Sequence, residues 1–417
     1  MAPRVLLLLP TTTYRSGDFL DAASRIGADV VVASEEASAV TPVNPGGLWT
    51  LDFRDPEASA RRAVELSAGS PPIDAVVGVD DDTAVAAAAI AQALGLPHVS
   101  VQAAEAARHK GRMRELLSAA GVAVPRHRVF PRTSDPSAAA AEVRYPCVLK
   151  PTFLAASRGV ILAKRPAEFL AAWERIGKIL DEPDARTRGG AAAGEILAED
   201  FVSGPEVALE GLLSVGELRV LALFDKPDPL EGPFFEETLY VTPSRLPGET
   251  RDAVADLVLR ASRALGLTEG PVHAEVRIGS AGPVLIETAA RSIGGLCSRT
   301  LRFGTGMSLE EVILRHALRM PAPAPREDVA AGVLMIPIPR PGTFERVSGL
   351  EAARQVPGIV EATITLRPGQ KLVPLPEGSR YLGFLFSRAA TPAEAERALR
   401  EAHAKLQIVT QEERSGP

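Results

Sequence analysis

Short apolar runs alternate with amphipathic stretches over the first hundred residues of the chain. Strands that alternate with helices at this spacing are typical of a parallel, doubly wound sheet. We therefore expect residues 1–105 to form one α/β domain. The predicted strands are 5–9, 29–33, 73–79 and 98–101, and the predicted helices are 19–26, 56–68 and 82–94.

The pattern changes beyond about residue 106, where apolar strands follow one another without a helix between each pair. This favours antiparallel pairing over 195–320 and a mixed α/β region at 321–417. The acidic stretch 181–194, rich in Gly and Arg, is predicted to be a mobile surface loop. Helices are expected at 110–120, 137–143, 252–265, 308–318 and 392–406, and strands at 128–130, 147–151, 159–163, 196–202, 206–213, 217–224, 332–338, 360–365 and 382–387.

Composition narrows the class of protein. A chain of 417 residues with 46% hydrophobic residues is long enough for two to four structural units. A net charge of -6 and a pI near 5.7, with no basic stripe, argue against nucleic acid or an anionic membrane as partner. Two cysteines are too few for a disulfide framework. We therefore expect a cytoplasmic protein with reduced thiols that acts on small molecules.

The first predicted strand is followed by Pro10 and three threonines instead of a glycine-rich phosphate loop. This argues against a dinucleotide site in the first domain. The acidic run Asp80 to Asp82 lies where the third strand ends and a helix begins. Two interpretations remain open: capping of the helix N-terminus, or contact with a substrate at the rim of a pocket.

Two glutamates stand out in an apolar background at 272–277 and 284–291. The alternation predicts a half-buried hairpin, connected over Ile278 to Pro283, in which Glu275 and Glu287 face one pocket. Two such carboxylates repel unless a cation lies between them, and hard oxygen ligands suit magnesium shared with nucleotide phosphates. The alternative is a pair of ordinary solvated strand residues.

Two further segments are compatible with a nucleotide site. Lys150 ends an apolar strand and precedes the small-residue loop 152–158, which offers a positive charge and backbone amides to phosphate, although such a loop is often only a turn. The segment Glu199 to Val202, with Glu206 nearby, resembles a hinge that reads adenine and the ribose hydroxyls.

The order and spacing of these elements resemble the ATP-grasp superfamily of carboxylate–amine ligases. The matching elements are Lys110, Val148-Leu149-Lys150-Pro151, the Ser-Arg-Gly-Val loop, 197–206, Glu275, Glu287 and Arg291. The runs 286–291 and 270–273 look most like bacterial L-amino-acid ligases that form dipeptides. The resemblance covers about residues 1–320 and implies an ATP-grasp fold at 106–320, with two α+β subdomains clasping ATP. The smaller of the two, a lid subdomain, would span about residues 135–200. It also implies a C-terminal α/β cap and a homodimer.

The resemblance implies roles for individual residues. Lys110, Lys150 and Ser157 would contact the ATP phosphates. Glu199, Phe201 and Val202 would surround adenine, and Glu206 would bind the ribose. Glu275 and Glu287 would hold Mg²⁺, with Mn²⁺ as an alternative metal. Arg291 would stabilise the acyl phosphate or its attacking partner, and His273 would lie near the substrate or simply pack beside Glu275.

Two residues depart from the superfamily pattern. Ala156 replaces a glycine of the phosphate loop, which narrows the backbone freedom of that loop. Ala289 replaces an asparagine that commonly completes the metal shell, so another ligand or water is required.

The pocket walls are less specified by the sequence. The loop 225–237 is expected to line the substrate pocket, with Glu236 or Glu237 holding an amino group, unless it is an ordinary omega loop. Gly294 and Gly295 would let backbone approach the substrate. Cys297 is predicted to be a buried structural thiol, and Arg299 or Arg302 would clamp a carboxylate or remain a surface charge.

The implied activity is transfer of the γ-phosphate of ATP to a carboxylate, followed by attack of an amine on the acyl phosphate. The loop Thr152 to Arg158 should close as a lid that excludes water. Two alternatives stay open: an enzyme that activates bicarbonate, and a nucleotide-binding protein without catalysis, which Ala156 and Ala289 would suggest.

Overall fold

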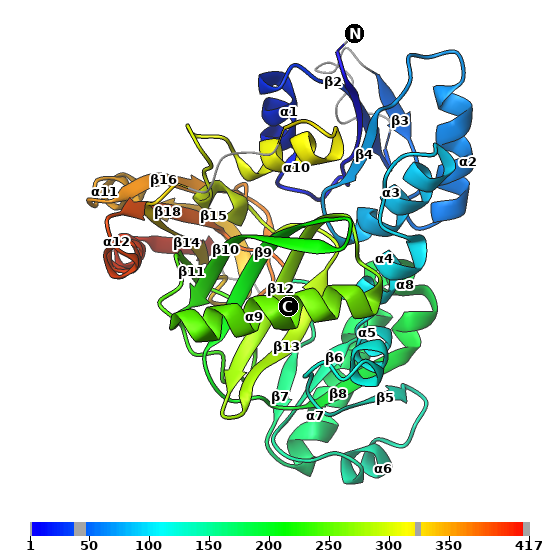
Figure 1. Cartoon of the computed structure of the whole chain (residues 1–417). Helices are drawn as coiled ribbons and strands as arrows, with labels where there is room; N and C mark the ends of the chain where they lie inside the picture. Colours follow the sequence, from blue (N-terminus) through cyan, green and yellow to red (C-terminus); the bar gives the residue numbers. More distant parts are fainter. Residues whose placement is uncertain (1, 37–46, 322–326, 412–417) are drawn as a thin grey trace.

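The computed structural model describes residues 2–36, 47–321 and 327–411 (Figure 1). The N-terminal domain is the predicted parallel sheet, in the order β3-β2-β1-β4, with helices packed against it. Its interior consists mainly of alanine and branched aliphatic side chains of strands and helices, together with the rings of Trp49 and Phe53. The elements are β1 (Arg4–Leu8), α1 (Ser16–Arg25), β2 (Asp29–Ser34), β3 (Leu48–Thr50), α2 (Pro56–Ser67), β4 (Ala75–Gly78) and α3 (Asp81–Ala93).

The predicted strand at 98–101 is wrong. These residues lead into helix α4 (Val101–Arg108), and the Ser100 side chain caps it by accepting a hydrogen bond from Ala103 N at 3.2 Å. The capping serine and the alanine-rich sequence after it favour a helix over a short strand. Helix α5 (Lys110–Ala119) follows and leads into the next unit.

The second unit is a small subdomain, which the superfamily resemblance predicts to be a lid, and it is drawn at the bottom of Figure 1. Its antiparallel sheet has the order β5-β8-β6-β7 and packs against α7 through Phe169, Trp173 and Ile176. The elements are β5 (His127–Pro131), α6 (Pro136–Ala141), β6 (Cys147–Pro151), β7 (Ile161–Ala163), α7 (Pro166–Asp181), α8 (Pro183–Gly189), η1 (Gly190–Gly194) and β8 (Glu195–Asp200).

The predicted mobile loop at 181–194 is also wrong, because it contains α8 and the 3₁₀ turn η1. Pro183 occupies the first turn of α8, where its fixed φ suits a helix. Ala185 is fully buried, and Asp184 accepts a hydrogen bond from Arg158. Charge and glycine content alone did not reveal these tertiary contacts.

The third unit is an eight-stranded sheet in the order β13-β12-β9-β10-β11-β14-β18-β16. Three strands from beyond residue 321 extend the sheet of the preceding unit, and a separate small sheet β17-β15-β19 lies beside them. The elements are β9 (Glu206–Ser214), β10 (Glu217–Lys226), β11 (Leu239–Thr242), α9 (Gly248–Leu265), β12 (Gly270–Gly279), β13 (Gly282–Ala289), η2 (Cys297–Thr300), α10 (Leu309–Ala317), β14 (Ala330–Ile336), β15 (Gly342–Ser348), α11 (Leu350–Arg354), β16 (Ile359–Ile364), β17 (Lys371–Leu372), β18 (Gly383–Ala389), α12 (Pro392–Ala404) and β19 (Gln407–Gln411).

Strand register aligns the polar side chains of this sheet. In the β12–β13 hairpin, Glu275 lies directly opposite Glu287, with a bulge just after Glu275. On the other side of β12, His273 lies opposite Glu210 and Arg277 opposite Glu206. Directly opposed residues share one face of a sheet, so a patch of ionisable groups forms on an otherwise apolar layer.

One buried ion pair fixes the N-terminal domain to the large sheet unit. Arg15, which precedes α1, donates to Val79 O at 3.0 Å, Ser292 Oγ at 2.9 Å and Glu310 Oε1 at 3.1 Å. Figure 1 shows α1 and α10 side by side at this junction. Within the described residues, no helix is both long enough and apolar enough to cross a membrane.

Candidate active site

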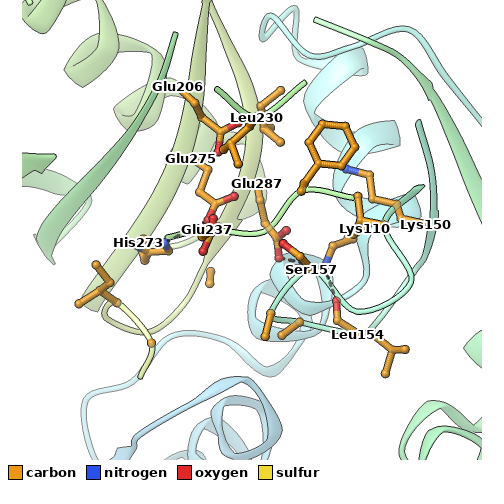
Figure 2. Close-up of a pocket in the computed structure, with 18 of the residues that line it drawn as sticks. Lys110, Lys150, Leu154, Ser157, Glu206, Leu230, Glu237, His273, Glu275 and Glu287 are labelled. Atoms are coloured by element: carbon orange, nitrogen blue, oxygen red, sulfur yellow. Dashed lines mark hydrogen bonds and ion pairs between the residues drawn. The ribbon is translucent and has the colours of Figure 1, made fainter. Parts of the chain in front are cut away.

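A cavity of 260 Å³ lies between the lid subdomain and the large sheet, with two lysines on one side and glutamates on the other (Figure 2). The fold therefore gathers residues from widely separated parts of the chain. Most of the candidate site residues singled out in the sequence line it: Lys110, Lys150, Ser157, Glu199, Phe201, Val202, Glu206, Glu237, His273, Glu275, Glu287, Arg291, Gly294 and Gly295.

Lys150 is held by a buried carboxylate. Its Nζ pairs with Glu199 Oε2, and the other oxygen of Glu199 accepts from Arg114 Nε. Burial raises the pKa of Glu199, but the positive charges of Arg114 and Lys150 outweigh it and lower the pKa to about 2. Glu199 is therefore ionised, and it fixes the direction of the Lys150 side chain toward the cavity.

Lys110 contacts both the loop 152–158 and the β12–β13 hairpin. Its Nζ lies 2.9 Å from Glu287 Oε1 and donates to Leu154 O at 2.8 Å. Its backbone N–H donates to Thr152 O at 2.7 Å. Lys110, at the start of α5, therefore contacts both the loop 152–158 and Glu287, a predicted metal ligand.

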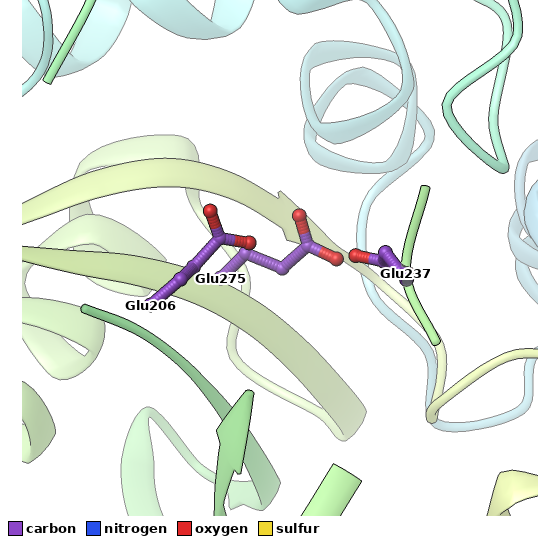
Figure 3. A group of neighbouring side chains, drawn as sticks. All are labelled: Glu206, Glu237 and Glu275. Carbon is purple, nitrogen blue, oxygen red and sulfur yellow. The ribbon is translucent and has the colours of Figure 1, made fainter. Parts of the chain in front are cut away.

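Three carboxylates converge on a buried lysine. Oxygens of Glu206, Glu237 and Glu275 lie within 4.8 Å of one another (Figure 3). The ammonium of Lys226 lies 2.7 Å from Glu206 Oε1 and 3.2 Å from Glu275 Oε1, and it also pairs with Glu237. The spacing suits a cation, and here the cation is the lysine Nζ.

These carboxylates differ in pKa. Burial, and after it repulsion from Glu275, raises the pKa of Glu237 to about 7 against the attraction of Lys226. Burial acts in the same direction on Glu275, but Lys226 and His273 outweigh it and hold its pKa well below the ordinary value. Glu275 is the ionised member of the pair, as a metal ligand must be.

His273 links Glu275 to the interior. Its Nδ1 contacts Glu210 Oε1, and its Nε2 lies 3.6 Å from Glu275 Oε1. Burial lowers the pKa of His273, but Glu210 and Glu275 outweigh it and raise the pKa to about 9. Glu210 also accepts from Ile293 N at 3.0 Å, so it anchors the segment that follows β13.

Arg277 forms the floor of the predicted adenine end. Its guanidinium lies over the neighbouring rings of Phe201 and Phe235, 5.0 Å and 5.7 Å from their centroids. It donates to Glu206 Oε2 at 2.8 Å and to Val202 O at 2.7 Å. The segment predicted to read adenine and the residue predicted to bind ribose are thus held by one arginine.

Arg291 connects the site to the N-terminal domain. Its guanidinium donates to Asp81 Oδ2 at 2.8 Å and to Ser292 O at 2.9 Å. Burial opposes the charge of Arg291, but Asp81 outweighs it and raises the pKa above its usual range. The acidic run also caps α3, because Asp80 and Thr83 form a capping box, so the capping interpretation is confirmed. Asp80 and Asp81 line the cavity as well, as the substrate-rim interpretation requires.

The loop 152–158, which is predicted to bind phosphate, has a constrained backbone. Ala156 and Ser157 both have positive φ, 54° and 55°, a region that costs a residue with a Cβ more than it costs glycine. Two contacts hold the loop to the segment before β18: Arg158 Nε donates to Glu377 O at 3.0 Å, and Gly159 N donates to Pro376 O at 2.8 Å.

Some expected contributors lie elsewhere. Arg299 pairs with Asp18 at 3.0 Å and with Glu361 at 2.5 Å, and Arg302 donates to Leu301 O at 2.7 Å; neither lines the cavity. Of the two acids proposed from the 225–237 loop, Glu237 lines the cavity and Glu236 does not. Cys297 is a buried free thiol, as predicted, 3.7 Å from Met335 Sδ.

Sequence reasoning missed Arg114, Glu210 and Lys226. Glu210 stands four residues after Glu206 on β9, so the strand period places both on one face. Lys226 ends an apolar strand, which is the same signal that identified Lys150. Arg114 lies on an amphipathic helix among other charged residues and gave no comparable signal.

The chain matches known families over three segments. The ATP-grasp domain family matches residues 143–300, and the ATP-grasp N-terminal domain family matches residues 20–98. Together with the lid, the large sheet and the site between them, these matches show that the chain belongs to the ATP-grasp superfamily. Residues 334–411 match the L-amino acid ligase C-terminal domain 2, so within the superfamily the chain is most like the L-amino-acid ligases.

Individual relatives agree with this placement. The chain is 29% identical to an alanine–anticapsin ligase of Bacillus subtilis over 64% of its own length and 58% of that protein. It is 30% identical to carnosine synthase 1 of Gallus gallus over 68% of its length but only 32% of that protein. The crystal structure of an L-amino acid ligase from Bacillus licheniformis superposes with a TM-score of 0.80 at 27% identity, covering 98% of this chain and 99% of that one. Of the alanine–anticapsin ligase and carnosine synthase 1, in contrast, the chain spans less than two thirds of the length.

Proposed function

We propose that the protein is an ATP-dependent ligase that activates the carboxylate of an amino acid as an acyl phosphate. It then joins that acyl group to an amine or a second amino acid and releases ADP and phosphate. The observation that supports this best is the arrangement of one cavity, in which Lys110 and Lys150 face Glu275 and Glu287. Phosphoryl transfer needs cations around the moving group and little covalent chemistry from the protein.

The residues present fit a nucleotide–metal complex. Glu275 and Glu287 lie opposite each other on β12 and β13. Each carboxylate pairs with a lysine ammonium, Glu287 with Lys110 and Glu275 with Lys226, so each lies where a positive charge is stabilised. In this proposal they hold Mg²⁺, or Mn²⁺, which neutralises charge on the phosphates. Ala289 adds no third protein ligand, and Glu237 is the additional carboxylate near Glu275.

The chain's own groups cover the rest of the reaction. Lys110, Lys150 and Ser157 bind phosphate oxygens, with Lys150 directed by Glu199. Arg291, held by Asp81, stabilises the negative charge of the acyl phosphate and of the oxyanion formed when an amine attacks it. The lid covers these groups and keeps water from hydrolysing the intermediate.

The donor amino acid would lie between Arg291 and the 225–237 loop. Glu237 supports this position because it is the cavity-lining acid of that loop and would hold the ammonium group. His273 supports Glu275 and lies close by. Gly294 and Gly295 also line this end, and a side chain at Gly295 would meet the ring of Phe384 at 3.2 Å.

A coupled assay tests the proposal. Purified protein, ATP and Mg²⁺ are incubated with pairs of amino acids, and ADP release and amide formation are followed together. We expect ADP release only when a suitable carboxylate is present. Production of AMP and pyrophosphate would contradict the acyl-phosphate route. The homodimer, which rests on the family resemblance, and the cytoplasmic location, which rests on the low cysteine content, are separate expectations, and light scattering of the purified chain tests the first.

A further inference from the structure

A second cavity, of 630 Å³, adjoins the first. It lies between the N-terminal domain, the phosphate loop and the segment before β18. The two cavities share part of their walls, so the residues of this common wall border both cavities. The shared residues are Asp80, Asp81, Leu154, Ala155, Ala156, Gly294 and Gly295.

Asp80 differs from its two acidic neighbours on this shared wall. Asp81 pairs with Arg291 at 2.8 Å, and Asp82 pairs with Arg188 at 2.7 Å and Arg108 at 3.3 Å. Asp80 is the N-cap of α3 and forms a capping box with Thr83, in which its backbone N–H donates to Thr83 Oγ1 at 3.2 Å. Its Oδ1, in contrast, is shielded from solvent and has no hydrogen-bond partner among the described residues. A buried carboxylate oxygen without a partner is costly, and such costs persist where function requires the group.

The surroundings of Asp80 raise the pKa of its carboxyl group. Burial is the largest effect, and repulsion from Asp82 and Asp81 adds to it, while Arg291 and Arg15 act in the opposite direction; the pKa rises to about 7. These groups come from α3, from the segment after β13 and from the segment before α1. A carboxylate with this pKa can both accept and release a proton near neutral pH.

Amide formation requires a base at this point. An amino group enters as an ammonium ion, which has no lone pair with which to attack a carbonyl carbon. A proton must therefore leave it inside the closed site. Lys110, Lys150 and Arg291 carry positive charge and donate hydrogen bonds, so they are unsuited to accept that proton.

We propose that the amine substrate enters through the second cavity and that Asp80 is the catalytic base that removes its proton. This inference rests on the proposed ligase function. The ammonium gives one proton to the Asp80 carboxylate, and the neutral nitrogen bonds to the acyl carbon. The carbon–oxygen bond to phosphate then breaks, the second amine proton passes to the departing phosphate, and Asp80 releases its proton to solvent through the second cavity.

Hydroxylamine separates this role from the rest of the reaction, because it is mostly unprotonated at neutral pH and needs no base. The Asp80→Asn variant keeps a residue that caps helices well and removes the base. Asp55→Asn makes the same change at the N-cap of α2, where Asp55 accepts from Ala58 N at 2.9 Å, and Asp55 lines neither cavity. The assay uses the amino-acid pair that gives the most ADP release, with hydroxylamine replacing the amine in a parallel series.

We expect Asp80→Asn to lower the rate of amide formation with the amino acid by about 100-fold or more, the usual size of a lost general base. Hydroxamate formation should stay close to that of the unchanged protein. The unchanged protein and Asp55→Asn should lose amide formation as pH falls below about 7, because the base becomes protonated.

Two results would overturn the assignment of Asp80. Equal losses of amide and hydroxamate would mean that Asp80 supports activation or folding, and full activity with both amines would mean that it is not needed. If the unchanged protein forms neither product, the ligase function itself fails, and this inference fails with it. A hydroxamate without any amide would leave the ligase function standing and contradict the amine route.

Discussion

At the scale of single residues, the site consists of carboxylates that are each held by a specific cation. Glu199 holds Lys150, Glu287 holds Lys110, and three acids surround Lys226. Candidates such as Lys150 and Glu275 could be predicted from the sequence because each interrupts an apolar strand. The partners could not be predicted, because Arg114 and Glu199 are 85 residues apart and meet only through the fold.

Removal of the Lys226 ammonium should destabilise the fold. Lys226→Met leaves Glu206, Glu237 and Glu275 buried without their shared counter-charge. The free energy of unfolding should fall by about 3 kcal/mol or more, the usual cost of breaking a buried ion pair. Denaturant unfolding measures this, and adding Glu237→Gln to Lys226→Met should recover part of the loss. If the double variant is no more stable than Lys226→Met, the claim that Lys226 neutralises these three carboxylates is contradicted.

Glu237 should make stability depend on pH. Its pKa rises from 4.5 to about 7 on folding, so in that range the folded protein retains a proton that the unfolded chain has lost. The contribution of Glu237 to stability is therefore full below pH 4.5 and is lost as pH rises through about 7. Glu237→Gln should show a smaller fall in unfolding free energy over this window than the unchanged protein. Identical slopes for the two proteins would contradict the assigned shift.

At the scale of elements, the β12–β13 hairpin could be predicted from the sequence pattern, but helix α8 of the small subdomain could not. Alternation predicted β12 and β13, although their connection is shorter than expected, only residues 280–281. The helix α8 was missed because its stability depends on the Arg158 contacts, which join distant segments. The extension of the sheet by β14, β18 and β16 was equally hidden, because strand pairing between distant segments leaves no local trace.

Arg158 should control the order of the lid. It pairs with Glu182 and Asp184 at 2.6 Å and donates to Glu377 O, so Arg158→Ala releases the phosphate loop from two sides. We expect weaker ATP binding, by about 1.5–3 kcal/mol, from the loss of charged hydrogen bonds. Calorimetry measures the affinity. The control Arg165→Ala removes a lid arginine that is 72% exposed and pairs only on the surface with Glu168, and it should bind ATP normally. Equal binding by all three proteins would contradict the role of Arg158.

At the scale of the whole molecule, the site depends on how the N-terminal domain sits on the large sheet. Asp80 and Asp81 from this domain line the cavity, and Arg15 joins the domain to the large sheet unit through Glu310. The fold class and the order of the units could be predicted from the alternation of elements and the superfamily resemblance. The docking could not, since Arg15 and Glu310 are 295 residues apart and neither belongs to a motif.

Arg15→Met should loosen this junction. It leaves Glu310 buried without its partner, and the pair is only 2% exposed on each side. We expect a loss of about 3 kcal/mol in unfolding free energy, with the N-terminal domain unfolding first. Arg25→Ala, which removes an arginine that is 58% exposed and pairs with Glu311 in the same region, should cost less than about 1 kcal/mol. Similar losses in both variants, measured by calorimetry, would contradict the docking role.

The account depends most on the coupling of ATP cleavage to amide formation. The direct test incubates the purified chain with ATP, Mg²⁺ and amino-acid pairs, and quantifies nucleotide products and peptides by mass spectrometry. We predict ADP, phosphate and a dipeptide in equal amounts, with no nucleotide cleavage when Glu275 and Glu287 are both changed to glutamine. AMP and pyrophosphate as products, or ADP release without any amide, would contradict the proposed function.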